Sequence, residues 1–102
     1  MLLINRRYVR GSVTRAGNDL FIQTVLNEWD ELRIENGSVV AFVSDEYEGS
    51  FRVLSAIRCP GGEPEAWAIL RRVGPLPKGH IAAKEARTNY AVRFDQAPTL
   101  HA

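Results

Sequence analysis

The side chains best suited to acid–base, nucleophilic or metal chemistry are few here: two histidines, His80 and His101, and one cysteine, Cys59. Histidine titrates near neutral pH, and a cysteine thiolate is a strong nucleophile. Their spacing forms neither HExxH nor CxxC, and the sequence contains no GxSxG turn and no phosphate-binding glycine loop. We interpret His80 as a loop residue and Cys59 as a small residue ending a strand. The sequence therefore predicts no catalytic residue, no metal site and no cofactor, and it favours a protein that is not an enzyme.

Carboxylates gather at Asp45, Glu46 and Glu48, around Tyr47. Clustered carboxylates attract hard cations such as calcium. This cluster lacks the alternating ligand spacing and the closing glutamate of a calcium-binding loop. We interpret it as the solvated turn of a hairpin.

Arginine-rich segments are the other candidate for chemistry, because guanidinium groups bind phosphates. A face for anions or nucleic acid would be made by Arg6, Arg7, Arg10, Arg52, Arg71 and Arg72. Bases could stack on Tyr8, Phe51 and Trp67, which accompany these segments. This hypothesis requires the arginines to converge on one face of the fold.

The net charge of +1 conceals three blocks of opposite sign. Residues 1–18 carry four arginines and no acid, residues 19–50 carry eight acids and one base, and residues 51–102 carry eight bases and four acids. Such blocks pair within a fold, pair between subunits or mark separate binding faces. We favour pairing within the fold, because surface ion pairs are common.

Two parts of the sequence resemble RNA-binding families. Residues 11–13, 19–22 and 37–42 are similar in spacing to a cold-shock OB barrel, although the aromatic stacking motifs of that family are absent. A helix, three strands and the run at residues 83–87 resemble a double-stranded-RNA-binding domain, but the first lysine of its last helix is missing. Each resemblance implies nucleic-acid binding and covers about half of the chain, so we assign the protein to neither family.

The sequence has 102 residues, of which 45% are hydrophobic and 25% are charged. This is enough apolar material for the core of one small domain, and neither a repeat nor a linker divides residues 1–102. The longest apolar run, residues 39–43, is much shorter than a membrane helix. Residues 1–4 are too short for a signal-peptide core, and a single cysteine fits a reducing compartment. We therefore expect a cytoplasmic protein without membrane contact.

Residues 19–35 show the strongest local pattern. At about 100° per residue, an apolar arc contains Phe21, Ile22, Val25, Leu26, Trp29 and Leu32. Asn18 and Asp19 are suited to cap the N-terminus of a helix there, and Asn36 with Gly37 is suited to end it. The pattern predicts a long amphipathic helix. A competing interpretation makes residues 20–26 a strand after a turn at residues 15–18 and makes Asn36 with Gly37 a hairpin turn, but it leaves the apolar arc unexplained.

Much of the remaining chain alternates between apolar and polar residues, as strands do. Residues 2–14 are expected to form one strand or a bent pair interrupted at Gly11. Residues 38–44 and 51–58 alternate on either side of the acidic turn, so they predict a hairpin.

Residues 65–73 fit either a third strand or a short helix. We favour the strand, because Trp67 suits a half-buried sheet. Residues 81–88 are expected to form two helical turns and residues 90–94 a last strand, and the tail from residue 96 is expected to fray.

These elements predict an α+β domain of two layers, in which the helix at residues 19–35 packs on an antiparallel sheet of about four or five strands. A ligand pocket between helix and sheet would be lined by Trp29, Trp67, Tyr47, Tyr90 and His80. We favour a non-enzymatic binding or accessory protein that acts through a protein partner or as a homo-oligomer, because one sheet face is left for a partner. The alternatives are a nucleic-acid-binding module and a small-molecule or enzymatic cleft. An exposed apolar strip on the uncovered sheet face would support the favoured function.

Overall fold

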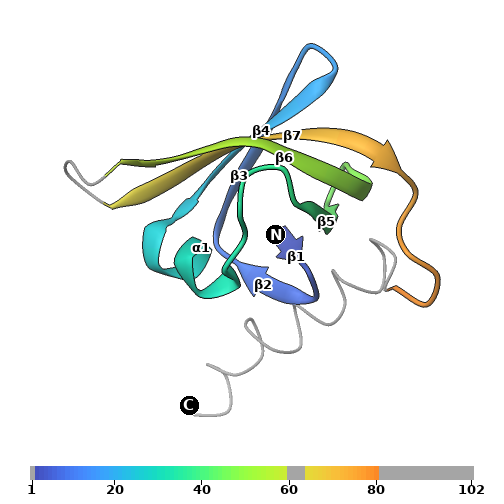
Figure 1. Ribbon diagram of the computed structural model, residues 1–102, viewed down its shortest axis with the longest axis horizontal. Helices are drawn as coiled ribbons and strands as arrows, with labels where there is room; N and C mark the ends of the chain where they lie inside the picture. Colours follow the sequence, from blue (N-terminus) through green and yellow to red (C-terminus); the bar gives the residue numbers. More distant parts are fainter. Residues whose placement is uncertain (1, 60–63, 81–102) are drawn as a thin grey trace, which may run out of the picture.

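The computed structural model describes residues 2–59 and 64–80 (Figure 1). Within these residues the chain forms seven strands and one helix, α1 (Leu26–Leu32). The strands are β1 (Leu2–Ile4), β2 (Arg7–Val9), β3 (Gly11–Ala16), β4 (Asp19–Val25), β5 (Val39–Ser44), β6 (Glu48–Cys59) and β7 (Glu65–Gly74). All neighbouring strands are antiparallel, in the order β2-β1-β5-β6-β7-β4-β3.

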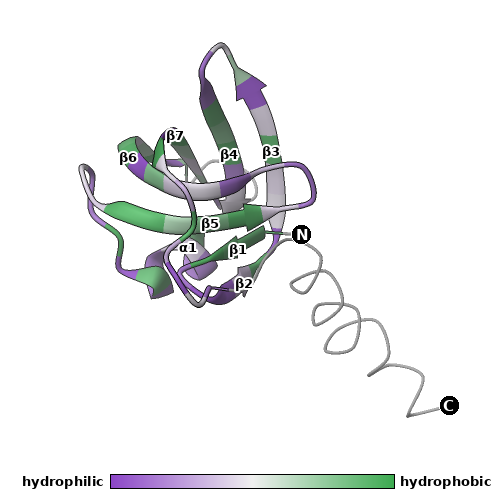
Figure 2. Cartoon of the chain, turned by 90° about the vertical axis from the view of Figure 1, so that its right-hand side faces the viewer, coloured by the Kyte–Doolittle hydropathy of each residue, from purple (hydrophilic) through white to green (hydrophobic). Residues whose placement is uncertain are grey.

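The sheet is curled into a half-barrel because its two outermost strands are consecutive in the chain. β2 and β3 stand at opposite ends of the strand order, yet only Arg10 separates them. The sheet must therefore bend until these two ends come together (Figures 1 and 2). Gly11 lies at this junction, where a Cβ atom would be 2.1 Å from the carbonyl oxygen of Gln23 on β4.

The hydrophobic core lies inside the curl. Alternate side chains of each strand point inward, and the largest of those that are fully buried are Leu2, Ile4, Ile22, Val40, Phe42, Val53 and Leu70. Phe42 and Phe51 meet edge to face, with ring centroids 5.5 Å apart. Burying each large apolar side chain contributes about 1.5–3 kcal/mol, so this cluster is the main source of stability.

The predicted α+β fold is wrong, because the segment that suggested one long helix is a strand over residues 19–25 and a short helix only over residues 26–32. Residues 19–25 form β4, whose backbone pairs with β3 on one side and β7 on the other. Its side chains alternate between buried and half-buried positions. Apolar residues occupy both faces of β4, with Ile22 inside and Phe21 and Val25 outside. When the same residues are placed at helical spacing, they fall on one side of the helix, which explains the misleading pattern. The competing interpretation is therefore correct for residues 20–25, whereas the turn at Asn36 and Gly37 joins α1 to β5 and closes no hairpin. The described part of the chain is predominantly β.

The helix α1 closes one open end of the curled sheet. It begins after Val25, which makes no side-chain cap, and ends at Arg33 in the left-handed conformation (φ 54°). Trp29 is its one buried residue, and the helix contacts β2, β4 and β7. The N–H of Leu26 donates to the carbonyl oxygen of Pro64 (3.2 Å), which ties the helix to the start of β7.

The predicted helix caps have other roles. Asn18 follows Gly17 in the two-residue turn of the β3–β4 hairpin. Gly37 has φ 89° in the turn that leads to β5, and its N–H donates to the carbonyl oxygen of Val53 (2.7 Å).

The hairpin of β5 and β6 and the strand at residues 65–73 are confirmed. Residues 2–14 contribute to three strands, because a two-residue turn at Asn5 and Arg6 separates β1 from β2. Both turn residues have positive φ, as this type of hairpin requires. The sheet therefore has seven strands in the described part of the chain, instead of the expected four or five. The predictions for residues 81–88, 90–94 and the tail from 96 lie outside the described residues.

Candidate functional site

The outer face of the sheet, opposite the core, carries a group of apolar side chains over β4, β6 and β7. We call it the outer patch, and its members are Phe21, Leu54, Ile57, Trp67 and Ile69. Ile57 pairs with Trp67 across β6 and β7, and Ile69 pairs with Phe21 across β7 and β4. Ile57 is 57% exposed, Leu54 38% and Ile69 37%. Clustered exposed apolar side chains of this kind mark interaction surfaces.

Two aromatic rings form the centre of the outer patch. Phe21 and Trp67 meet edge to face, with centroids 6.0 Å apart and planes at 64°. The indole N–H of Trp67 donates to Oε2 of Glu65 (2.9 Å). This hydrogen bond satisfies the indole N–H, and the Trp67 side chain remains partly exposed on the outer face.

The outer patch has an acidic end and a basic end. Along β7 the outward residues are Glu65, Trp67, Ile69 and Arg71, and Arg52 of β6 lies beside Arg71. Arg52 donates from Nη1 to the carbonyl oxygen of Gly37 (2.8 Å). The observed hydrogen-bond partners of Glu65 and Arg52 are neutral, so both residues retain a net charge.

Arg71 forms two hydrogen bonds with the carboxylate of Asp19, at 2.9 and 3.2 Å. These hydrogen bonds and the charge of Arg71 lower the pKa of Asp19 below its ordinary value of 3.8, and the pKa of Arg71 is raised in return. At the basic end of the outer patch, the charge of Arg71 is thus balanced by Asp19, whereas the charge of Arg52 is not balanced by a carboxylate.

The Asp19–Arg71 pair predicts an acid-dependent loss of stability. Because the pKa of Asp19 is depressed in the folded state, its stabilisation is present above the ordinary aspartate pKa and disappears as pH falls through the folded value. We expect Asp19→Asn to be less stable than the wild type at pH 7 and equally stable at pH 2. Urea denaturation at both pH values measures this difference. A gap that persists at pH 2 would contradict the assignment.

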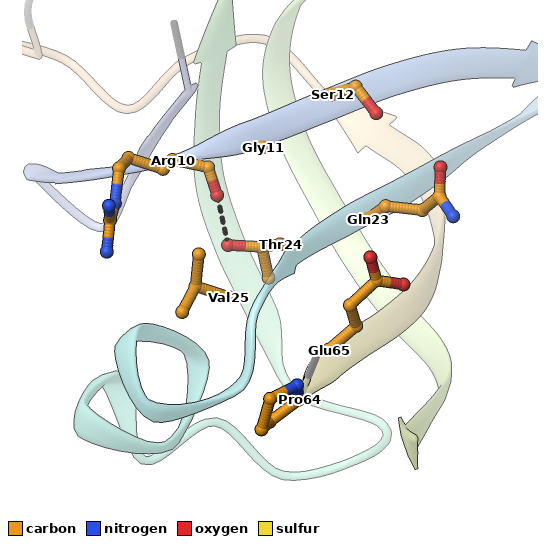
Figure 3. A pocket seen from close by; sticks show the side chains of 8 residues that line it. All are labelled: Arg10, Gly11, Ser12, Gln23, Thr24, Val25, Pro64 and Glu65. Carbon is orange, nitrogen blue, oxygen red and sulfur yellow. Dashed lines mark hydrogen bonds between the residues drawn. The ribbon is translucent and has the colours of Figure 1, made fainter. Parts of the chain in front are cut away.

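A groove adjoins the acidic end of the outer patch (Figure 3). Its volume is about 480 Å³, and it is lined by Arg10, Gly11, Ser12, Gln23, Thr24, Val25, Pro64 and Glu65. The hydroxyl of Thr24 donates to the carbonyl oxygen of Arg10 (2.6 Å), which fixes the floor. The side chain of Arg10 points away from Gln23 and Glu65, and its Nε donates to Glu28 (2.8 Å).

The residues predicted to line one ligand pocket lie in different parts of the fold. Trp29 is buried inside the curl, whereas Trp67 is on the outer face. Tyr47 closes the β5–β6 turn, where its N–H donates to Oγ of Ser44 (3.1 Å). His80 follows β7 in a turn closed by its N–H and the carbonyl oxygen of Pro77 (3.1 Å). Tyr90 lies outside the described residues. The structure therefore does not bring the two tryptophans to one cleft.

The arginines proposed for an anion-binding face are also dispersed. Arg6 is in the β1–β2 turn, Arg7 and Arg10 pair with Glu31 and Glu28 of α1, and Arg52 and Arg71 are on the outer face. Arg72 donates to the carbonyl oxygen of Glu48 (3.3 Å).

Ion pairs join the charge blocks within the fold, as expected. Arg7, Arg10, Arg58 and Arg71 each contact a carboxylate from residues 19–50.

The sequence did not predict Phe21, Leu54, Ile57 and Ile69 as candidate site residues. A β-bulge between Val53 and Ser55 shifts the register of β6 by one residue. Such a shift exchanges the two faces of a strand, so Ile57 points outward although it continues the spacing of the buried Phe51 and Val53. Simple alternation therefore places it in the core.

Among residues 2–59 and 64–80, no three His, Cys, Asp or Glu side chains gather closely enough to hold a metal ion. The same part of the chain contains no helix that is long and apolar enough to cross a membrane. No protein family, curated protein or solved structure matches this chain. The function is therefore inferred from the geometry of the chain itself.

Proposed function

We propose that this protein is a non-enzymatic interaction module that pairs with a second copy of itself through the outer patch. The supporting observation is the cluster of exposed apolar side chains on β4, β6 and β7, with Ile57 more than half exposed. Water exclusion from such a surface favours association. A cytoplasmic location remains part of this proposal, supported by the free thiol of Cys59.

The charges at the two ends of the outer patch favour one arrangement of the copies. Consider a two-fold axis that lies in the interface and crosses the strands near Ala68. It places Trp67 of one copy over Ile69 of the other and brings Glu65 toward Arg71 and Arg52 of the other copy. An axis parallel to the strands would instead bring like charges together, which destabilises an interface. The self-complementary arrangement is the one that a two-fold dimer requires.

The size of the outer patch predicts a weak dimer. With about 3.3 Å per residue from Glu65 to Arg71 and about 4.8 Å for each of three strands, the patch and its charged ends cover roughly 23 by 14 Å. This is below the area of a standard stable interface, so we expect a dissociation constant of about 1–100 µM.

Sedimentation equilibrium at protein concentrations from about 1 to about 500 µM spans the expected dissociation constants and tests the proposal. The wild type is compared with two matched variants. Ile57→Asp places a carboxylate in the outer patch and should weaken self-association at least about tenfold, because a buried unpaired charge is costly. Asn27→Asp adds the same negative charge at an exposed position of α1, outside the outer patch, and should have little effect. A wild-type protein that stays monomeric throughout would exclude the proposal, as would equal effects of both variants.

We do not propose nucleic-acid binding, because no observation favours it over self-association. It requires Arg6, Arg7 and Arg10 to share a face with the arginines of β7. In the fold, Arg7 and Arg10 engage carboxylates of α1, and Arg71 lies on the outer face paired with Asp19.

A further inference from the structure

The strand β3 (Gly11–Ala16) has an open edge. It pairs with β4 along its whole length and, among the described residues, has no strand on its other side. Its side chains are exposed except for Val13, which is partly buried against the core. Figure 2 shows β3 at the margin of the sheet. An exposed edge of this kind is a template for pairing with another extended chain.

The backbone groups available at this edge follow from the hairpin geometry. Gly17 and Asn18 form a two-residue turn closed by the pair Ala16 and Asp19. In such a turn the closing pair exchanges both of its hydrogen bonds, and the pairs alternate from there. The alternation directs the N–H and C=O groups of Gly11, Val13 and Arg15 toward the open edge.

The position that an added strand would occupy beside the open edge of β3 is collinear with β1. β2 continues into β3 through Arg10, and β2 pairs with β1 from Ile4↔Arg7 to Leu2↔Val9. A chain added antiparallel to β3 would therefore extend the row that β1 occupies. It would run between β3 and the turn that follows β5.

A pocket of about 210 Å³ opens on the inner side of this place. Leu2 and Val13 give it apolar walls, and Ser44, Asp45 and Glu46 line it from the end of β5. Gly11 and Ser12 complete the lining. A lysine or arginine side chain fits such a pocket, since its aliphatic stem packs on apolar walls while its charged end reaches the carboxylate of Glu46.

We propose that β3 binds an extended peptide by strand addition, with a lysine or arginine of the peptide in the pocket beside Val13. The main-chain hydrogen bonds of Gly11, Val13 and Arg15 supply affinity, and the pocket supplies selectivity, as in other cases of strand addition. The carboxylate of Glu46 repels phosphate groups, so the occupant is a peptide and not a nucleic acid. None of these residues belongs to the outer patch, so this site is independent of self-association.

The test uses a labelled, end-blocked peptide, Ser-Val-Thr-Lys-Thr-Val-Ser, and a twin with glutamate in place of lysine. We expect saturable binding of the lysine peptide below about 1 mM, with an affinity about tenfold higher than that of the twin. Amide NMR shifts should concentrate at Gly11, Val13 and Arg15. Absence of saturation, equal affinity for both peptides, or shifts confined to the outer patch would each overturn the proposal.

Two matched variants of Arg15 separate backbone pairing from side-chain contacts. Arg15→Pro removes an N–H at the open edge and should weaken peptide binding about tenfold, because proline blocks a strand edge. Arg15→Ala loses the same bond from Nε to the carbonyl oxygen of Gly17 but keeps the N–H, and it should bind within about twofold of the wild type. Equal losses in both variants would contradict strand addition.

A further variant keeps the test decisive if Arg15→Pro does not fold. Glu46→Gln should reduce the preference for lysine over glutamate from about tenfold to about threefold. An unchanged preference would contradict a role for the pocket.

Ile57→Asp should bind the peptide like the wild type, so a failure of self-association is distinguishable from a failure at β3. Self-pairing of two β3 edges would appear as association that Ile57→Asp retains and Arg15→Pro loses, and it would replace the peptide as the occupant.

Discussion

Replacement of Phe42 by alanine is expected to lower the free energy of unfolding by about 4 kcal/mol. Phe42 is fully buried inside the curl and meets the ring of Phe51 edge to face. Truncation removes the transfer free energy of the ring and leaves a cavity that the surrounding strands fill only in part. Because domains of this size are stable by about 5–15 kcal/mol, the loss is a large fraction of the total. Urea denaturation followed by circular dichroism measures it.

Phe21→Ala is the matched control, since the same residue type lies on the opposite face of the sheet. Phe21 is half-buried, so the monomer should lose clearly less than in Phe42→Ala, about 1–2 kcal/mol. Its removal should instead weaken self-association, because its ring contacts Trp67 in the outer patch. Equal destabilisation of the monomer by both substitutions would show that the sheet is not oriented with Phe42 inside and Phe21 outside.

Gly11→Ala is the second substitution with a large expected effect. A Cβ atom at this position would lie 2.1 Å from the carbonyl oxygen of Gln23 and 3.0 Å from the Cα atom of Thr24. Both contacts are with backbone atoms of β4, so relief requires the two strands to move apart. We expect a loss of about 3 kcal/mol in the free energy of unfolding, at the upper end for overpacked sites.

Gly74→Ala provides the control for Gly11. Nothing lies within 4 Å of a Cβ atom built at Gly74, so its substitution should change stability by no more than about 0.5 kcal/mol. Thermal unfolding of the two variants gives the comparison. If Gly11→Ala were as stable as Gly74→Ala, the close approach of β3 to β4 would be wrong.

Residues 19–35 show where local sequence patterns stop being informative. Ile22 and Leu20 point into the core, while Phe21 and Val25 point outward into a second apolar surface. A strand with apolar residues on both faces has no clean period of two, so a helical arc fits it equally well. Pairing of β4 with β7, which lies about 45 residues further along the chain, satisfies its backbone as a strand. Only that distant partner distinguishes the two structures.

The candidate site was partly visible in the sequence. The sequence predicts an interaction surface on an uncovered sheet face, but it assigns Trp67 to a pocket between helix and sheet, whereas Trp67 lies on the outer face. The sequence does not predict the residues that surround Trp67, because the apolar pattern of β4 also fits a helix and the bulge in β6 reverses the direction of Ile57. The groove beside Glu65 likewise joins β3, β4 and the start of β7, which no local pattern connects.

The amino-acid sequence by itself determined the hairpin of β5 and β6, the strand β7, and charge blocks that pair within the fold. These features depend on composition or on contacts between neighbouring segments, which local periodicity and turn residues encode. Tertiary structure alone decided that residues 19–25 are a strand, that the sheet curls until β2 and β3 meet at Arg10, and that the outer patch and the open edge of β3 exist. Each of these features depends on pairing between strands that are distant in the sequence. Such pairing selects the conformation of a segment and the face that it buries when its own sequence is compatible with more than one choice.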